Sequence, residues 1–191
     1  YKEKLSEAAA TSERLVKEAT VRGQAKEEEI IREANQRAAA IRAKASADIA
    51  QEKKKAINDA KESIQLCTPY FIPSEQLSTA LEIAVSSGVR VELMLPEKAD
   101  SYIVQHASFS FLKPLLQRGV QVYLYKKGFI HAKTVCIDGQ LAFVGTVNLD
   151  MRSFYINYEI ASIVSDEAYC KRLENQFEID KEASDLITLY I

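Results

Sequence analysis

The first sixty residues constrain the fold more than any other part of the chain, because they contain no proline and only one glycine, Gly23. Of these 60 positions, 24 are Lys, Arg, Asp or Glu and 15 are alanine, a composition that favours helix. At roughly 1.5 Å per residue, such a helix would be about 90 Å long. It has no core of its own, so it needs a partner helix or remains solvated along its length.

Small residues recur every eleven positions along this segment, at Ser12, Gly23, Ala34, Ala45 and Ala56. Eleven residues in three helical turns favour a right-handed supercoil. We therefore interpret residues 1–60 as a helix of coiled-coil type, with a homodimer as a possible pairing. The alternative is a single charged helix in which the alanine spacing is accidental, and charge runs such as 53–55 are most simply solvated faces.

This pattern, together with residues 29–34 and 48–57, resembles the soluble stalk of the F-type ATP synthase b subunit. The resemblance covers residues 1 to about 60. It implies a dimeric peripheral stalk without catalysis.

Residues 61–191 have a different composition, with 28 charged positions out of 131 and all of the proline and phenylalanine of the chain. Apolar alternation, turn residues and helix caps predict an α/β domain, in which a mixed β-sheet of about six strands is flanked by helices. The expected strands are 63–68, 89–95, 120–125, 129–137, 141–146 and 157–164, and the expected helices are 74–87, 102–118 and 166–181.

Charge and cysteine content argue against several functions. The whole chain carries a formal charge of −2, and residues 61–191 carry 12 basic and 16 acidic side chains, so we expect no nucleic-acid partner. Three cysteines at irregular spacing indicate neither a disulfide framework nor a zinc site. No run of about 18 apolar residues occurs, so we expect no transmembrane segment.

The chemistry is concentrated in residues 128–148. His131 and Lys133 are two positions apart on an expected strand, so their side chains share a face. An imidazole beside a fixed ammonium suits a phosphate group, because the lysine neutralises oxygens while the histidine attacks phosphorus or transfers a proton. Asp138 precedes a glycine, and the pair is explained as a hairpin turn.

The strand that follows the hairpin brings Gly145, Thr146 and Asn148 back to the end where His131 lies. Glycine permits a close backbone approach, and the threonine hydroxyl and asparagine amide can donate to phosphate oxygens. These three residues are therefore the expected substrate-binding group.

The joint spacing of His131, Lys133 and Asp138 resembles the HKD signature of the phospholipase D superfamily. Residues 68–73, 145–154 and 157–160 resemble the C-terminal half of bacterial cardiolipin synthases, and the resemblance runs from about residue 56 to 191. It implies a transferase that passes a phosphatidyl group through a phospho-histidine and needs neither metal nor cofactor. His131 would be nucleophile or acid/base, Lys133 and Asn148 would bind phosphate oxygens, and Glu159 would orient His131.

That family combines two HKD motifs in one site, whereas this sequence contains one, and its only other histidine is His106. We therefore expect a half-domain that is inactive until a second HKD half joins it, from another copy or another chain. The resemblance implies a phospholipid of the phosphatidylglycerol type as substrate and a cytoplasmic location, peripheral to the membrane. The alternatives are a nuclease with the same chemistry and a non-catalytic stalk or scaffold.

Overall fold

The structure is a computed structural model that describes residues 1–188. It gives no side-chain description for Glu3, Ala9, Ser46, Ala50 and Tyr155. The chain divides into two compact units, Tyr1–Lys44 and Ala45–Ile191, and each is described by itself.

The first unit consists of the greater part of one helix, α1 (Lys2–Asp59). The predicted long N-terminal helix is therefore confirmed. Leu5, Ile30 and Ile41 are exposed on it, and ion pairs one turn apart, such as Arg14 with Glu18, run along its surface. Exposed ion pairs of this kind contribute only about 0.3–0.5 kcal/mol each to the stability of the helix. Whether α1 packs against a partner helix stays a prediction.

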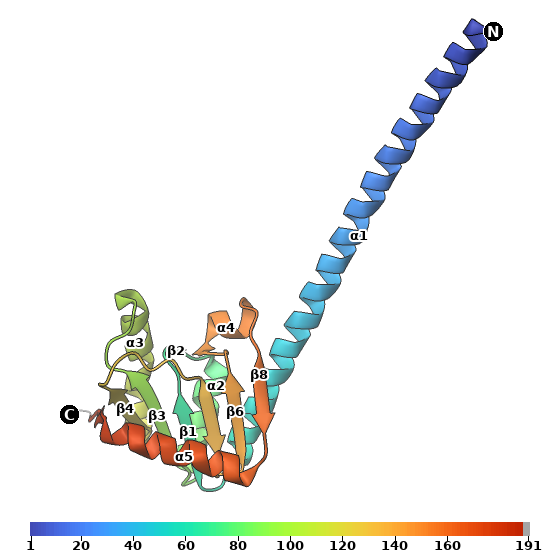
Figure 1. Ribbon diagram of the computed structural model, residues 1–191. Helices are drawn as coiled ribbons and strands as arrows, with labels where there is room; N and C mark the ends of the chain where they lie inside the picture. The colour runs from blue at the N-terminus through green and yellow to red at the C-terminus, as the bar shows by residue number, and fades with distance from the viewer. Residues whose placement is uncertain (189–191) are drawn as a thin grey trace. The chain divides into compact units, whose positions relative to one another are not determined.

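The second unit is built on a seven-stranded sheet in the order β8-β6-β5-β1-β3-β4-β9 (Figure 1). β1 runs parallel to β3, and β3 runs parallel to β4, while all other neighbours are antiparallel. The predicted mixed sheet flanked by helices is thus confirmed. The strands are β1 (Ser63–Cys67), β3 (Arg90–Pro96), β4 (Gln121–Tyr125), β5 (Thr134–Ile137), β6 (Leu141–Gly145), β8 (Ala161–Val164) and β9 (Ser184–Leu186).

Helices α2 (Glu75–Ser86) and α3 (Tyr102–Arg118) connect the parallel strands, as crossover helices do. The end of α1 joins them against one face of the sheet, where Ile64, Leu93 and Phe143 lie in the same core. Helix α5 (Glu167–Glu182) crosses the other face (Figure 1). The central strands are buried on both faces, and for that reason they read as continuous apolar runs in the sequence.

The last turns of α1 belong to the packing of this second unit. Ile57 is 1% exposed and Lys53 is 7% exposed, while Lys54 and Lys55 are exposed. The interpretation of residues 53–55 as a solvated charge run is therefore wrong for Lys53, which lies one turn before Ile57 on the same face. Packing of this unit begins before residue 60, where the charge composition changes.

Several short elements were not expected from the sequence. β2 (Phe71–Ile72) pairs in parallel with β7 (Leu149–Asp150) in a separate small sheet, and α4 (Met151–Tyr155) follows directly. The expected strand 129–137 is wrong in its first half, because β5 begins at Thr134. Its neighbour β1 ends at Cys67, opposite Thr134, and a proline follows soon after, so residues 128–133 have no strand to pair with. The expected strand 157–164 likewise begins only at Ala161.

Candidate active site

The predicted site residues gather mainly at one end of the strands, at the edge of the sheet formed by the carboxyl end of β1 and not at an outer strand. β5 begins and β6 ends at this edge, and the Gly145 N–H donates to the Lys133 carbonyl oxygen at 3.3 Å. β8 begins there as well, since Gly145 lies opposite Ala161. The segments that precede β5, follow β6 and precede β8 therefore meet at this edge (Figure 1).

Gly145 and Thr146 fasten the segment before β8 to the end of β6. A Cβ atom on Gly145 would lie 2.1 Å from the Ile160 carbonyl oxygen, so only glycine allows this approach. The Thr146 N–H donates to that oxygen at 2.8 Å, and the Ile160 N–H donates to the Thr146 hydroxyl at 2.9 Å. Both residues thus have a structural task, and their contact with a phosphate stays a prediction.

Lys133 lies half-buried in the loop before β5, so its predicted placement on a strand with His131 is wrong. Its Nζ donates to the His131 carbonyl oxygen at 2.8 Å, which ties the two residues together across the loop. Burial lowers the pKa of Lys133, and the negative charges of Glu159 and Asp150 act in the opposite direction. The ammonium is therefore partly desolvated, and an anion that reached it would interact strongly.

His131 is exposed, and aromatic rings lie beside it. Its ring centroid is 5.5 Å from that of Phe129, which in turn is 6.1 Å from Tyr70. The Tyr70 hydroxyl donates to Asp100 at 2.7 Å, and burial followed by that bond raises the pKa of Tyr70 to about 12. The imidazole is accessible to a ligand, and Tyr70 stays neutral near it.

Asn148 is 9% exposed. Its side-chain oxygen is buried and has no hydrogen-bond partner among the described residues. An unsatisfied buried polar atom costs about 1–3 kcal/mol, and such atoms are uncommon in native folds. That oxygen can only accept a hydrogen bond, so it would pair with a donor group of a ligand, and the expected donation from the Asn148 amide nitrogen to a phosphate oxygen stays a prediction.

Glu159 accepts hydrogen bonds from the Ser153 hydroxyl at 3.2 Å and the Asn157 amide at 3.0 Å. Its expected bond to His131 is not among the hydrogen bonds of the described residues, so the orienting role stays a prediction. Sequence reasoning missed Ser153 and Asn157 as the partners of Glu159. The nearby Asp150, 8% exposed, caps α4 by accepting the Ser153 N–H at 2.6 Å, and the spacing Asp-x-x-Ser was an available signal for it.

Asp138 lies at the opposite edge of the sheet, at the far end of β5. With about 3.4 Å per residue, five residues separate its Cα from that of Lys133 by roughly 17 Å. Its carboxylate accepts the N–H groups of Lys61, Glu62 and Ser63 at 2.9, 2.8 and 2.9 Å. These bonds outweigh the opposing effect of burial and lower the pKa of Asp138. The structure does not bring this residue to the others.

The remaining arrangement suits an anionic, phosphate-like ligand. An exposed imidazole and a partly desolvated ammonium lie on one segment, and this pair can bind phosphate oxygens and offer a nucleophile. The other histidine, His106, is exposed on α3, and its ring centroid lies 3.9 Å from that of Tyr102, with the two rings tilted by 42°. Within the described residues, no group of three or more His, Cys, Asp or Glu side chains could hold a metal ion.

Comparison with known families finds one that matches most of this unit. Residues 54–181 match the family described as "Cardiolipin synthase, PLD-like domain". A probable cardiolipin synthase of Bacillus subtilis, YwiE, is 46% identical over 132 residues, which are 69% of this chain and 26% of that protein. A cardiolipin synthase of Oceanobacillus iheyensis is 45% identical over 134 residues, 70% of this chain and 28% of that protein. The chain therefore spans little more than a quarter of the length of these curated relatives.

Solved structures show the same fold. Nuc of Salmonella typhimurium, a phospholipase D family member, has a TM-score of 0.64 at 18% identity and covers 71% of this chain and 88% of its own. The phosphatidylserine synthase of Haemophilus influenzae has a TM-score of 0.63 at 16% identity and covers 73% of this chain and 37% of its own. The family match begins at residue 54, and the stalk resemblance of residues 1–60 stays a prediction.

Proposed function

Residues 54–181 of this chain belong to the cardiolipin synthase family of phospholipase D-like domains, and from that membership we propose that the domain is one half of a phosphatidyltransferase site. Its substrate would be a phospholipid phosphodiester of the phosphatidylglycerol type. The observation that carries the proposal is the combination, at one sheet edge, of exposed His131 and half-buried Lys133, with buried Asn148 on the segment that follows β6.

The proposed reaction has two steps. In the first, a histidine nitrogen attacks the phosphorus, a P–N bond forms, and the P–O bond to the leaving glycerol breaks while an acid gives that oxygen a proton. In the second, a base takes the proton of the incoming alcohol, its oxygen attacks phosphorus, and the P–N bond breaks. Lys133 and Asn148 would bind the non-bridging phosphate oxygens throughout.

These steps need both a nucleophilic and an acid/base imidazole, and His131 can fill one role at a time. His106 is exposed on α3, where its ring nitrogen Nδ1 lies 2.9 Å from the Tyr102 carbonyl oxygen, and no contact between it and His131 occurs among the described residues. We therefore infer that a second HKD half joins the site, from another copy or another chain, and that α1 can supply the pairing of two copies.

The surface around the site fits contact with lipid. Phe129 is 39% exposed, and Ile156 and Ile160 are each 72% exposed, all on the segments that meet at the site edge. In the described residues no helix is long and apolar enough to cross a membrane. From these exposed apolar side chains we propose an encounter with phospholipid that is peripheral, at the bilayer surface on its cytoplasmic side.

The test is turnover of phosphatidylglycerol vesicles, with cardiolipin and glycerol measured across a series of protein concentrations. Dependence on a second HKD half predicts a specific activity that rises with protein concentration or on addition of a partner half. His131→Ala should abolish turnover, while His106→Ala, the matched histidine control, should leave it unchanged. Full activity in a chain shown to be monomeric would contradict the two-half requirement, and equal activity of His131→Ala would contradict the site itself.

A further inference from the structure

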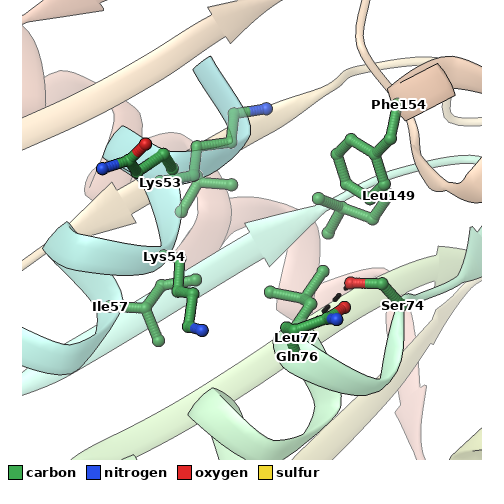
Figure 2. A pocket seen from close by; sticks show the side chains of 10 residues that line it. Lys53, Lys54, Ile57, Ser74, Gln76, Leu77, Leu149 and Phe154 are labelled. Atoms are coloured by element: carbon green, nitrogen blue, oxygen red, sulfur yellow. Dashed lines mark hydrogen bonds between the residues drawn. The ribbon is translucent and has the colours of Figure 1, made fainter. Parts of the chain in front are cut away.

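A cavity of about 190 Å³ lies in the second unit. Figure 2 shows Lys53, Lys54 and Ile57 of α1 on one side of it, and Ser74, Leu77, Leu149 and Phe154 on the other. The remaining lining residues are Gln51, Gln76 and Val135. Although five of the ten lining residues are polar or charged, most of the lining surface is apolar, so the cavity fits a hydrocarbon group.

Lys53 is the unusual member of this lining, because it is only 7% exposed. Its Nζ lies 5.9 Å from the centre of the Phe143 ring. No hydrogen bond or ion pair of Lys53 occurs among the described side chains. Burial lowers the pKa of Lys53 to about 8, against the attraction of Glu159, so the amine is largely a cation at neutral pH.

A buried cation without a contacting anion is unfavourable, and an apolar residue of similar volume would pack as well or better. The ring of Phe143 offsets only part of this cost. An anion that entered the cavity would supply the missing partner. The cavity thus provides two complementary features, an apolar wall and one desolvated positive charge.

We propose that this cavity binds the hydrocarbon chain of an anionic amphiphile, with the acidic group of that molecule on the Lys53 amine. An apolar cavity of roughly 150 Å³ takes up benzene, so 190 Å³ accommodates a short hydrocarbon segment. Lys54, exposed and also lining the cavity, adds a second positive charge. The ligand is either a free fatty acid or an acyl chain of an anionic phospholipid.

This inference goes beyond the proposed phosphatidyl transfer and does not depend on it. None of His131, Lys133, Asn148 and Glu159 lines the cavity. Its test is therefore a binding measurement, which can succeed or fail whatever the outcome of the turnover assay.

The experiment is calorimetric titration of the full chain with octanoate, with octanol as the neutral probe and octyltrimethylammonium as the cationic one. Octanoate should bind at least about tenfold more tightly than either, as expected when one charged contact is made. Lys53→Met should remove that preference and leave octanol binding within about twofold. Lys55→Met, the matched loss of an exposed neighbouring charge outside this lining, should change neither.

Two further measurements keep the proposal falsifiable if Lys53→Met does not fold. Octanoate should shift the methyl resonances of Leu77, Val135 and Leu149 in the unaltered chain. Dihexanoyl phosphatidylglycerol in competition with octanoate identifies the source, since displacement of octanoate by the lipid favours the phospholipid, and its failure favours the free acid. Absence of octanoate binding, unshifted cavity methyls, or equal affinity for octanoate and octanol would overturn the proposal.

Discussion

Replacement of Asp138 should destabilise the fold, by amounts that the geometry of its three hydrogen bonds predicts. Oδ1 accepts the N–H groups of Glu62 and Ser63, and Oδ2 accepts that of Lys61. The residue itself has a positive φ of 52°, which asparagine tolerates and alanine does not. At about 1 kcal/mol for each bond, since two of the donors are exposed and can rehydrate, Asp138→Ala loses roughly 3 kcal/mol from the bonds and about 1 kcal/mol more from the backbone.

Asp138→Asn should cost less, about 1–2 kcal/mol, because it keeps one acceptor oxygen and the turn conformation. The two variants also differ from the unaltered chain in their pH dependence. The pKa of Asp138 in the folded state lies below its ordinary value of 3.8. Its contribution is therefore fully present above that value and is lost as the pH falls through the folded-state pKa, so the gap between Asp138→Asn and the unaltered chain should narrow in that acidic range.

The assay is urea unfolding followed by tyrosine fluorescence, since the chain contains 9 tyrosines and no tryptophan. Asp48→Asn is the matched control, because Asp48 is exposed on α1. The reasoning is refuted if Asp138→Ala changes the free energy of unfolding by no more than the control does. It is also refuted if alanine and asparagine give the same loss.

Three other substitutions or probes test separate parts of the fold. Gly145→Ala should destabilise by about 2–3 kcal/mol, measured by the same unfolding assay, because its methyl group would displace the Ile160 carbonyl; an unchanged midpoint would contradict this. Glu92→Gln should cost about 3 kcal/mol by that assay, because Glu92 is 1% exposed and pairs with Lys181 at 2.7 Å; a loss below about 1 kcal/mol would speak against the pair. Burial raises the pKa of the Cys67 thiol to about 12, so iodoacetamide at pH 8 should label it only after unfolding, as mass spectrometry would show.

The sequence was informative wherever an element buries a regular face. α2 begins after the cap Ser74, whose hydroxyl accepts the Leu77 N–H, and α3 ends at Gly119, whose φ of 102° needs glycine. These local signals predict helix limits without reference to the rest of the fold. The hairpin at Asp138 and Gly139 was equally visible, because its turn chemistry lies in two adjacent residues.

The short elements at the site escaped prediction because they depend on distant partners. β2 and β7 have two residues each, too few for any periodicity, and they exist because Phe71 lies opposite Leu149. The loop containing His131 reads as part of a strand by alternation alone. Only the end of the neighbouring β1 at Cys67 determines that pairing starts at Thr134.

Some features of the site were likewise predicted from the sequence, and others depend on residues far along the chain. The spacing of His131 and Lys133 was a sound guide to their proximity, although a side chain-to-backbone bond and not a shared strand face joins them. Asp138 belongs to the motif spacing but was explained as a hairpin turn, and the strand between it and Lys133 places its carboxylate at the other edge, on the N–H groups of residues 61–63. Partners of Glu159 could not be read, because the turn that brings Ser153 and Asn157 to it is formed by α4.

At its C-terminal end, α1 has one face exposed to solvent and another face packed against the sheet domain, and Lys53 lies on the packed face. In the sequence it is one of three consecutive lysines, and its neighbours are indeed exposed. Ile57 and Ala60 follow it at helical spacings and lie in the core of the sheet domain, so the face that α1 must bury includes position 53. The family match begins one residue later. The N-terminal helix therefore contributes a buried charge to a domain that the family comparison describes without it, and replacing that helix would alter the cavity.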